Sequence, residues 1–163
     1  MTISTRAMII NGTLTAGKFN QKKNKTEYGV TCLIRDESKT KICDMIAKEV
    51  DSLTEFNANE KADLLGNLVN KFKKSENFAP PFDTVVSFYT GYAVVGDYSI
   101  DPDVDDVQSG DTVIIKFVVK YGKTQVFGKN VCYVKMYPKA VKLEQHGKAL
   151  IDTFSGMNEG DLV

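Results

Sequence analysis

Hydrophobic and polar residues alternate over several stretches of the chain, and a period of two predicts β-strands. The first expected strand bends at Gly12, a basic loop follows at residues 18–25, and a short polar loop is expected at residues 122–125. The strands expected from the pattern cover residues 2–17, 27–35, 84–95, 112–121 and 126–143.

Between residues 38 and 74 the hydrophobic period changes to three and four, which predicts helices. Ser38 is the expected cap of a first helix over residues 39–55. Asn57 followed by Glu60 resembles a capping box, and it predicts a second helix over residues 58–73. Because proline fixes its own φ and has no amide hydrogen, Pro80 and Pro81 end the helical region.

Together these elements predict a mostly β or α+β fold, a small five-stranded barrel with a helical insertion at about residues 38–74. The length of 163 residues fits one domain, which we place at residues 1–148. Residues 149–163 are expected to form a short, flexible, acidic C-terminal tail.

The net charge of zero hides a strong segregation of charge along the chain. Residues 1–35 carry six basic groups against one acidic group, and residues 112–148 carry eight lysines against Glu144. Residues 94–111 carry six aspartates and no basic group. Spacing in this acidic segment does not match a calcium-binding loop, since Asp106 and Thr112 occupy the positions of the required glycine and glutamate. We expect a solvated loop there.

Several classes of function find little support. The chain has no nucleophile-elbow, P-loop or dinucleotide-binding motif, so we do not expect an enzyme or a cofactor. Three widely spaced cysteines form no CxxC pair and His146 is the single histidine, which argues against a metal site. No apolar run reaches the ~20 residues of a membrane span and no signal pattern opens the chain. We therefore expect a protein of the reducing cytoplasm with no membrane contact.

The remaining signal is basic residues interleaved with aromatic ones, a pairing that suits single-stranded nucleic acid. Lysines neutralise phosphates, and flat rings stack on unpaired bases. The other interpretation is that some of these rings fill the core and the lysines protect a solvent-exposed face. A register shift of one residue exchanges the two faces of a strand, so the pattern alone does not decide which aromatics face outward.

One stretch resembles a known family. Residues 112–121, Gly128, residues 131–136 and residues 140–143 resemble the closing strands of the replication single-stranded DNA-binding proteins of T-odd coliphages and their relatives. Residues 28–34 running into the helix agree with the same family. The resemblance covers about residues 26–56 and 84–144, and it implies an oligonucleotide-binding (OB) barrel that binds single-stranded DNA without sequence preference.

The resemblance also implies roles for particular residues and partners. Tyr121 matches the stacking tyrosine of the family, and Arg35 falls near its basic position before the helix; Phe127 is our own addition. The family further implies that an acidic tail contacts replication proteins such as polymerase and helicase-primase. Among the partners of this chain we also include a second copy of itself, as a homodimer. This chain departs from the family in lacking tryptophan and in ending on Leu162 and Val163.

From these observations we predict sequence-independent binding of single-stranded DNA in replication, recombination or repair, in the cytoplasm of an infected host cell if the protein is viral. The loops after the first and fourth strands frame the binding face of OB folds. The residues expected to bind DNA are Tyr121, Phe127, Lys123, Lys129, Lys120, Lys116, Lys18, Phe19, Lys22, Lys23, Lys25 and Arg35. The alternative is a non-enzymatic structural or protein-interaction barrel, such as a phage assembly protein.

Overall fold

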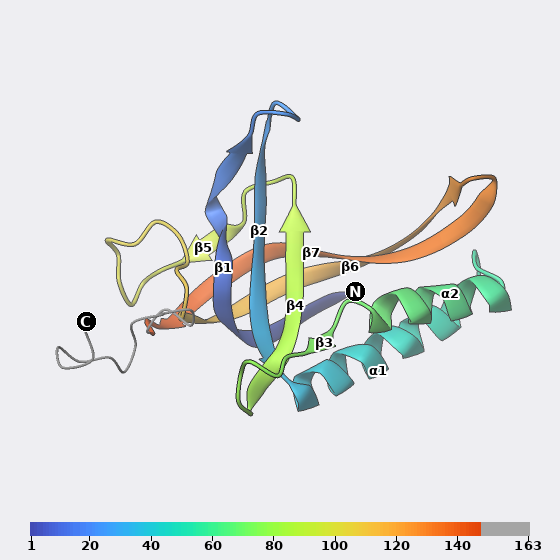
Figure 1. Cartoon of the computed structure of the whole chain (residues 1–163), viewed down its shortest axis with the longest axis horizontal. Helices are drawn as coiled ribbons and strands as arrows, with labels where there is room; N and C mark the ends of the chain where they lie inside the picture. The colour runs from blue at the N-terminus through green and yellow to red at the C-terminus, as the bar shows by residue number, and fades with distance from the viewer. Residues whose placement is uncertain (148–163) are drawn as a thin grey trace, which may run out of the picture.

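A computed structural model describes residues 1–147, so the predicted C-terminal tail at residues 149–163 lies outside the described residues. Two helices, α1 (Asp36–Ser52) and α2 (Ala58–Val69), follow the second strand (Figure 1). The strands are β1 (Thr2–Asn20), β2 (Lys25–Arg35), β3 (Lys73–Lys74), β4 (Phe82–Thr90), β5 (Val95–Asp97), β6 (Thr112–Val126) and β7 (Lys129–Gln145). Neither helix of this described part is long and apolar enough to cross a membrane.

The strands form one sheet in the order β3-β4-β2-β1-β6-β7-β5. All neighbouring strands run antiparallel except β5 and β7. β4 and β7 contact each other, so the sheet curls towards a closed barrel. The five long strands follow the order of an OB fold, which confirms the predicted five-stranded barrel with a helical insertion. β3 and β5 are short additions that the pattern did not predict.

Alternate residues of the long strands fill the interior of the barrel. On β6 the buried side chains are Val113, Ile115, Phe117 and Val119. The rings of Phe117 and Phe88 pack at 4.8 Å between centroids. Because successive side chains of a strand point to opposite faces, Lys116 and Lys120 lie outside the barrel.

The helical insertion is confirmed, but the expected cap of α1 is wrong. Arg35 is the N-cap and makes no side-chain capping bond, and Asp36 and Glu37 occupy the first turn, where carboxylates interact favourably with the helix dipole. The predicted capping box of α2 is present. Glu60 N–H donates to Asn57 Oδ1 at 2.8 Å, and Asn57 N–H donates to Glu60 Oε1 at 3.0 Å.

Both predicted loops are shorter than expected, because strand pairing extends into them. β1 and β2 leave only residues 21–24 as a turn, so Lys18, Phe19 and Lys25 belong to strands. β6 continues through residues 122–125 to Val126. The true turn is Phe127-Gly128, with φ of +51° and +76°, the pattern of a two-residue type I′ hairpin.

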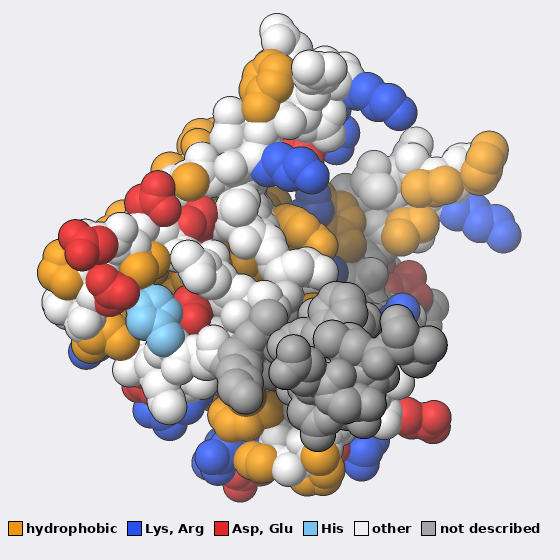
Figure 2. Space-filling model, turned by 60° about the vertical axis from the view of Figure 1, so that its left-hand side comes forward, with side chains coloured by type: hydrophobic (Ala, Val, Ile, Leu, Met, Phe, Trp, Pro, Cys, Tyr) orange, Lys and Arg blue, Asp and Glu red, His pale blue; other side chains and the backbone are white. Residues whose placement is uncertain are grey.

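The acidic segment at residues 97–111 is exposed at Asp97, Asp103 and Asp105, as expected of a solvated loop, but two of its other aspartates are buried. Asp106 is buried, and its carboxylate accepts hydrogen bonds from the backbone N–H groups of Leu14, Thr15, Ala16 and Val107 at 2.8–3.2 Å. Asp111 is also buried and lies 3.1 Å from His146 Nδ1. The two aspartates therefore fix the segment against β1 and the end of β7, and the acidic side chains gather around the histidine in Figure 2.

Candidate nucleic-acid interface

The β1–β2 hairpin projects away from the barrel and carries the N-terminal basic block (Figure 1). All five residues predicted here are exposed: Lys18, Phe19, Lys22, Lys23 and Lys25. Phe19 exposes 56% of its surface, and Lys23 forms an ion pair with Glu27 at 3.2 Å. The structure thus brings these residues together on one projecting arm.

The β6–β7 hairpin is a second projecting arm (Figure 1). Phe127 at its tip is fully exposed, next to exposed Val126, Val131 and Lys129. Phe127 has a positive φ, which is uncommon for an aromatic residue. A backbone conformation of this kind costs ~1–3 kcal/mol, and residues that adopt one are concentrated at functional sites. Hydrophobic side chains at the end of this arm are visible in Figure 2.

One face of the β6–β7 hairpin is covered by the helical insertion, and Tyr121 points to it. The Tyr121 ring packs against the hydrophobic core, and its hydroxyl is buried. Burial, and then the nearby carboxylate of Glu49, raise the pKa of Tyr121. This position makes Tyr121 a poor platform for stacking.

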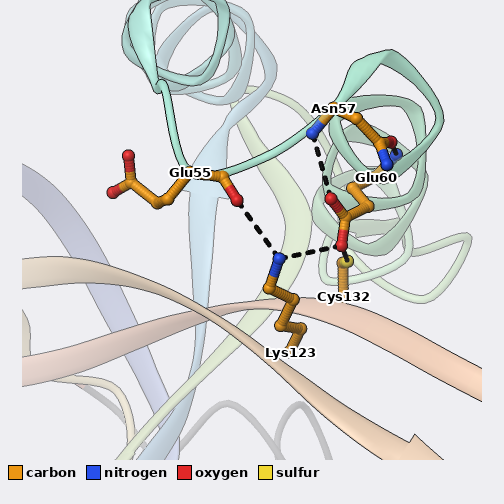
Figure 3. Close-up of polar contacts among 5 residues, drawn as sticks. All are labelled: Glu55, Asn57, Glu60, Lys123 and Cys132. Carbon is orange, nitrogen blue, oxygen red and sulfur yellow. Dashed lines mark hydrogen bonds and ion pairs between the residues drawn. The ribbon is translucent and has the colours of Figure 1, made fainter.

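Lys123 lies on the same covered face, where it connects the hairpin to α2 through an ion pair with Glu60 (Figure 3). Its Nζ donates to Glu60 Oε2 at 3.0 Å and to the backbone carbonyl of Glu55 at 3.1 Å. It also lies 5.1 Å from the Phe56 ring centroid. The Asn57 backbone N–H and then Lys123 lower the pKa of Glu60. Lys123 therefore has its charge engaged within the protein.

The opposite face of the hairpin is open and carries Lys120, Tyr133 and Lys135. Lys120 and Lys135 are directly opposed in the register. Tyr133 is paired with Gly122, and a Cβ on Gly122 would lie 2.5 Å from the tyrosine ring. Because Gly122 has no side chain, the Tyr133 ring can lie flat on the sheet, and Lys135 Nζ is 5.0 Å from the centroid of this ring.

Tyr89 on β4 repeats this arrangement. It is paired with Gly29, and a Cβ on Gly29 would lie 2.1 Å from the ring. Tyr89 still exposes 62% of its surface. A recess of about 370 Å³ beside the ring is lined by Lys71, Lys73 and Ser87 among others. A flat, exposed ring beside two lysines is suited to stack on a base while the lysines contact phosphates.

Lys71 links the β4 recess to the β6–β7 hairpin. It follows the C-terminal end of α2 and is half-buried. Burial lowers the pKa of Lys71, and the charge of nearby Lys135 lowers it further. A bound anion would relieve the repulsion between Lys71 and Lys135. We define the candidate interface as Tyr89, Tyr133, Lys71, Lys73 and Lys135, together with the two hairpin tips.

Besides Tyr121 and Lys123 on the covered face, two predicted residues, Arg35 and Lys116, lie away from this set. Arg35 is at the end of β2 opposite to the β1–β2 tip, forms an ion pair with Glu37 at 3.4 Å and stacks on Phe82. Lys116 is on the outer face of β6, four residues before Lys120. The structure does not bring Arg35 to the candidate interface.

The sequence analysis did not include any of the five central residues, Tyr89, Tyr133, Lys71, Lys73 and Lys135, among those expected to bind DNA. Lys71 and Lys73 lie within residues 36–93, where acidic residues outnumber basic ones, so the analysis of charge did not single them out. A usable signal was present in Phe88-Tyr89, because two adjacent aromatic residues on a strand point to opposite faces and one of them must face outward.

The contacts of Lys123 lead to a testable difference between two lysines. We expect Lys123→Ala to lower the melting temperature by roughly 2 °C with little effect on binding of oligo-dT, because its charge is already paired. Lys135→Ala is the matched variant, which should weaken binding and leave melting unchanged. Calorimetry and fluorescence anisotropy measure the two effects, and equal losses of affinity would contradict the assignment.

Comparison with known proteins bears on the fold. No family model and no curated protein sequence matches the chain. Among solved structures, a C-terminally truncated single-stranded DNA-binding protein from bacteriophage Enc34 superposes with a TM-score of 0.55 at 9% identity, covering 91% of this chain and 87% of that one. The single-stranded DNA-binding protein gp2.5 of bacteriophage T7 gives 0.54 at 15% identity, covering 94% and 95%. This chain has the fold of phage single-stranded DNA-binding proteins.

A third structure of this fold contains a ligand. The Enc34 protein in complex with single-stranded DNA matches with a TM-score of 0.50 at 9% identity, over 91% of this chain and 88% of that one. At these identities the likeness shows the OB fold, as the strand order does. The role of each side chain in this OB fold is therefore argued from its own geometry.

Proposed function

We propose that the protein binds single-stranded DNA without sequence preference. The observation that carries the proposal is the pair of tyrosines, Tyr89 and Tyr133, each lying over a glycine with lysines beside it. Stacking on a ring tolerates every base, because each base has a π-face. The OB fold shared with phage single-stranded DNA-binding proteins supports the same conclusion.

In this proposal the phosphates meet the lysines and the bases meet the rings. Lys71, Lys73 and Lys135 neutralise phosphates at the centre, and binding is strengthened by the counterions released. Phe19 and Phe127 contact bases from the two projecting arms, with Lys18, Lys22, Lys25 and Lys129 beside them. These arms are the loops that frame the binding face of OB folds.

The biological role that we propose is the coating of transient single strands in phage DNA replication, recombination or repair. The resemblance of the sequence to replication proteins of phages supports this role. The same resemblance supports contacts of residues 149–163 with replication proteins.

Fluorescence anisotropy with labelled oligo-dT and with duplex DNA of the same length tests the function at two salt concentrations. We expect binding to oligo-dT that weakens with salt, with a slope of about −0.7 for each phosphate neutralised, and weaker binding to the duplex. Absence of binding to oligo-dT at low salt would reject the function and favour the protein-interaction barrel.

A further inference from the structure

The outer face of the β6–β7 ribbon carries more lysines than the candidate interface uses. We propose that this face, the outer lysine track (Lys116, Lys120, Lys135, Lys139 and Lys142), binds a further length of the same DNA strand after it leaves the interface. The inference rests on the proposed function and extends it. It implies a binding site longer than the OB barrel face alone.

The register of β6 and β7 aligns the track. Lys120 is opposite Lys135, Val118 is opposite Tyr137, and Lys116 is opposite Ala140. Successive positions on one face of a strand are about 7 Å apart, so the track runs continuously from Lys135 towards β5. Lys135 belongs to the candidate interface as well, and a strand bound there therefore reaches the track directly.

Lys142 of the track lies opposite Asp97 in the β5–β7 register and interacts electrostatically with Asp97 and Glu144. In residues 1–147, no ion pair involves the other four lysines, Lys116, Lys120, Lys135 and Lys139, whereas Lys23, Lys74 and Lys123 each have a carboxylate partner. Like charges directly opposite each other, as in Lys120 and Lys135, destabilise a sheet. Glu144 on the same ribbon is engaged by Arg6 at 2.7 Å. Lys116, Lys120, Lys135 and Lys139 therefore supply unpaired positive charge that a polyanion would neutralise.

Aromatic rings accompany the lysines of the track. Lys139 Nζ lies 5.9 Å from the Tyr137 ring centroid, and Lys135 Nζ lies 5.0 Å from that of Tyr133. Both tyrosines are half-buried on the same face of β7. The alternation of cation and ring is the one that single-stranded nucleic acid requires.

The track ends at an apolar recess next to β5. The recess has a volume of about 250 Å³ and is lined by Val95, Ile114 and Ala140, and the charged residues in its lining are Lys116, Lys142 and Asp97. Val95 exposes 71% of its surface although it is aliphatic. An apolar surface between two lysines can hold a base while its phosphates contact the ammonium groups. These features favour nucleic acid over an acidic protein segment, because the track continues the proposed DNA interface.

A comparison of short and long oligonucleotides tests the track. We would measure competition by unlabelled oligo-dT of about 8 and about 24 nucleotides, lengths within and beyond the 4–16 nucleotides of one OB fold. The DNA is kept in excess so that each strand binds one protein. The variant combines Lys116→Ala, Lys139→Ala and Lys142→Ala, all exposed positions outside the candidate interface.

We expect this triple variant to bind the short oligonucleotide like the wild type and the long one roughly tenfold more weakly. Its salt slope for the long oligonucleotide should flatten by about 2, because three lysines each contribute about 0.7. The control replaces Lys39, Lys41 and Lys48 of α1 by alanine, which removes the same charge from another face and should change neither value.

Wild-type affinity of the triple variant for both lengths would overturn the track and leave the proposed function standing. Failure of the wild type to bind even the short oligonucleotide would instead reject the proposed function. Unchanged DNA affinity together with a changed sedimentation coefficient would assign the face to self-association and also overturn the track.

Discussion

Replacing both Tyr89 and Tyr133 by alanine is expected to weaken binding of oligo-dT by about 30-fold or more. Each base–ring stack contributes ~1–3 kcal/mol, and 1.4 kcal/mol corresponds to a factor of ten. The fold should be retained, since Tyr89 is exposed and neither ring belongs to the buried core. Equilibrium titration by anisotropy measures the loss, and circular dichroism checks the fold.

Conservative variants separate stacking from other roles of these residues. Tyr89→Phe and Tyr133→Phe keep the ring and remove only the hydroxyl, so both should bind like the wild type. Tyr121→Phe is a further control, because its hydroxyl is buried away from the interface. Full affinity of the double alanine variant would show that the bases stack elsewhere.

The second large effect is expected on stability. Asp106→Ala should lower the free energy of unfolding by roughly 3 kcal/mol or more, because it leaves buried backbone N–H groups without their charged acceptor. Four N–H groups depend on this carboxylate, three on Oδ1 and that of Ala16 on Oδ2. Urea unfolding measures the loss.

Two variants refine the prediction for Asp106. Asp106→Asn keeps one oxygen acceptor and sets an amide donor against a donor, so an intermediate loss is expected. Asp103→Ala removes an exposed aspartate from the same segment and should leave stability unchanged. Equal stability of Asp103→Ala and Asp106→Ala would contradict the anchoring role of Asp106.

The periodicity of the sequence predicted the barrel, both helices and the capping box, because each depends on local spacing. The chemical role of individual lysines depends on more. Lys120 and Lys123 look equivalent in the sequence, yet they lie on opposite faces of β6. Lys120 faces solvent, whereas Lys123 contacts Glu60. Which face the helices cover is decided by tertiary packing, and the alternation of β6 alone contains no information on it.

The ends of the elements were harder to predict for a related reason. Polar residues such as those at 122–125 form strand here because a partner strand pairs with each of them, although their composition is typical of a loop. Likewise, six aspartates suggested a solvated segment, whereas Asp106 finds its partners on β1, about ninety residues earlier in the chain. Contacts this distant leave no local pattern.

The tyrosine–glycine pairs have a consequence for how this surface tolerates mutation. Each ring depends on a residue of the neighbouring strand that has no side chain, so a single methyl group at Gly29 or Gly122 would push the ring off the sheet while leaving the tyrosine intact. The determinants of base stacking are thus distributed over two strands, with Gly29 and Tyr89 far apart in the sequence and Gly122 and Tyr133 on the same hairpin. As long as the tyrosine of a pair is retained for stacking, its partner position must remain glycine. We therefore expect each glycine to be replaced in evolution only together with its tyrosine.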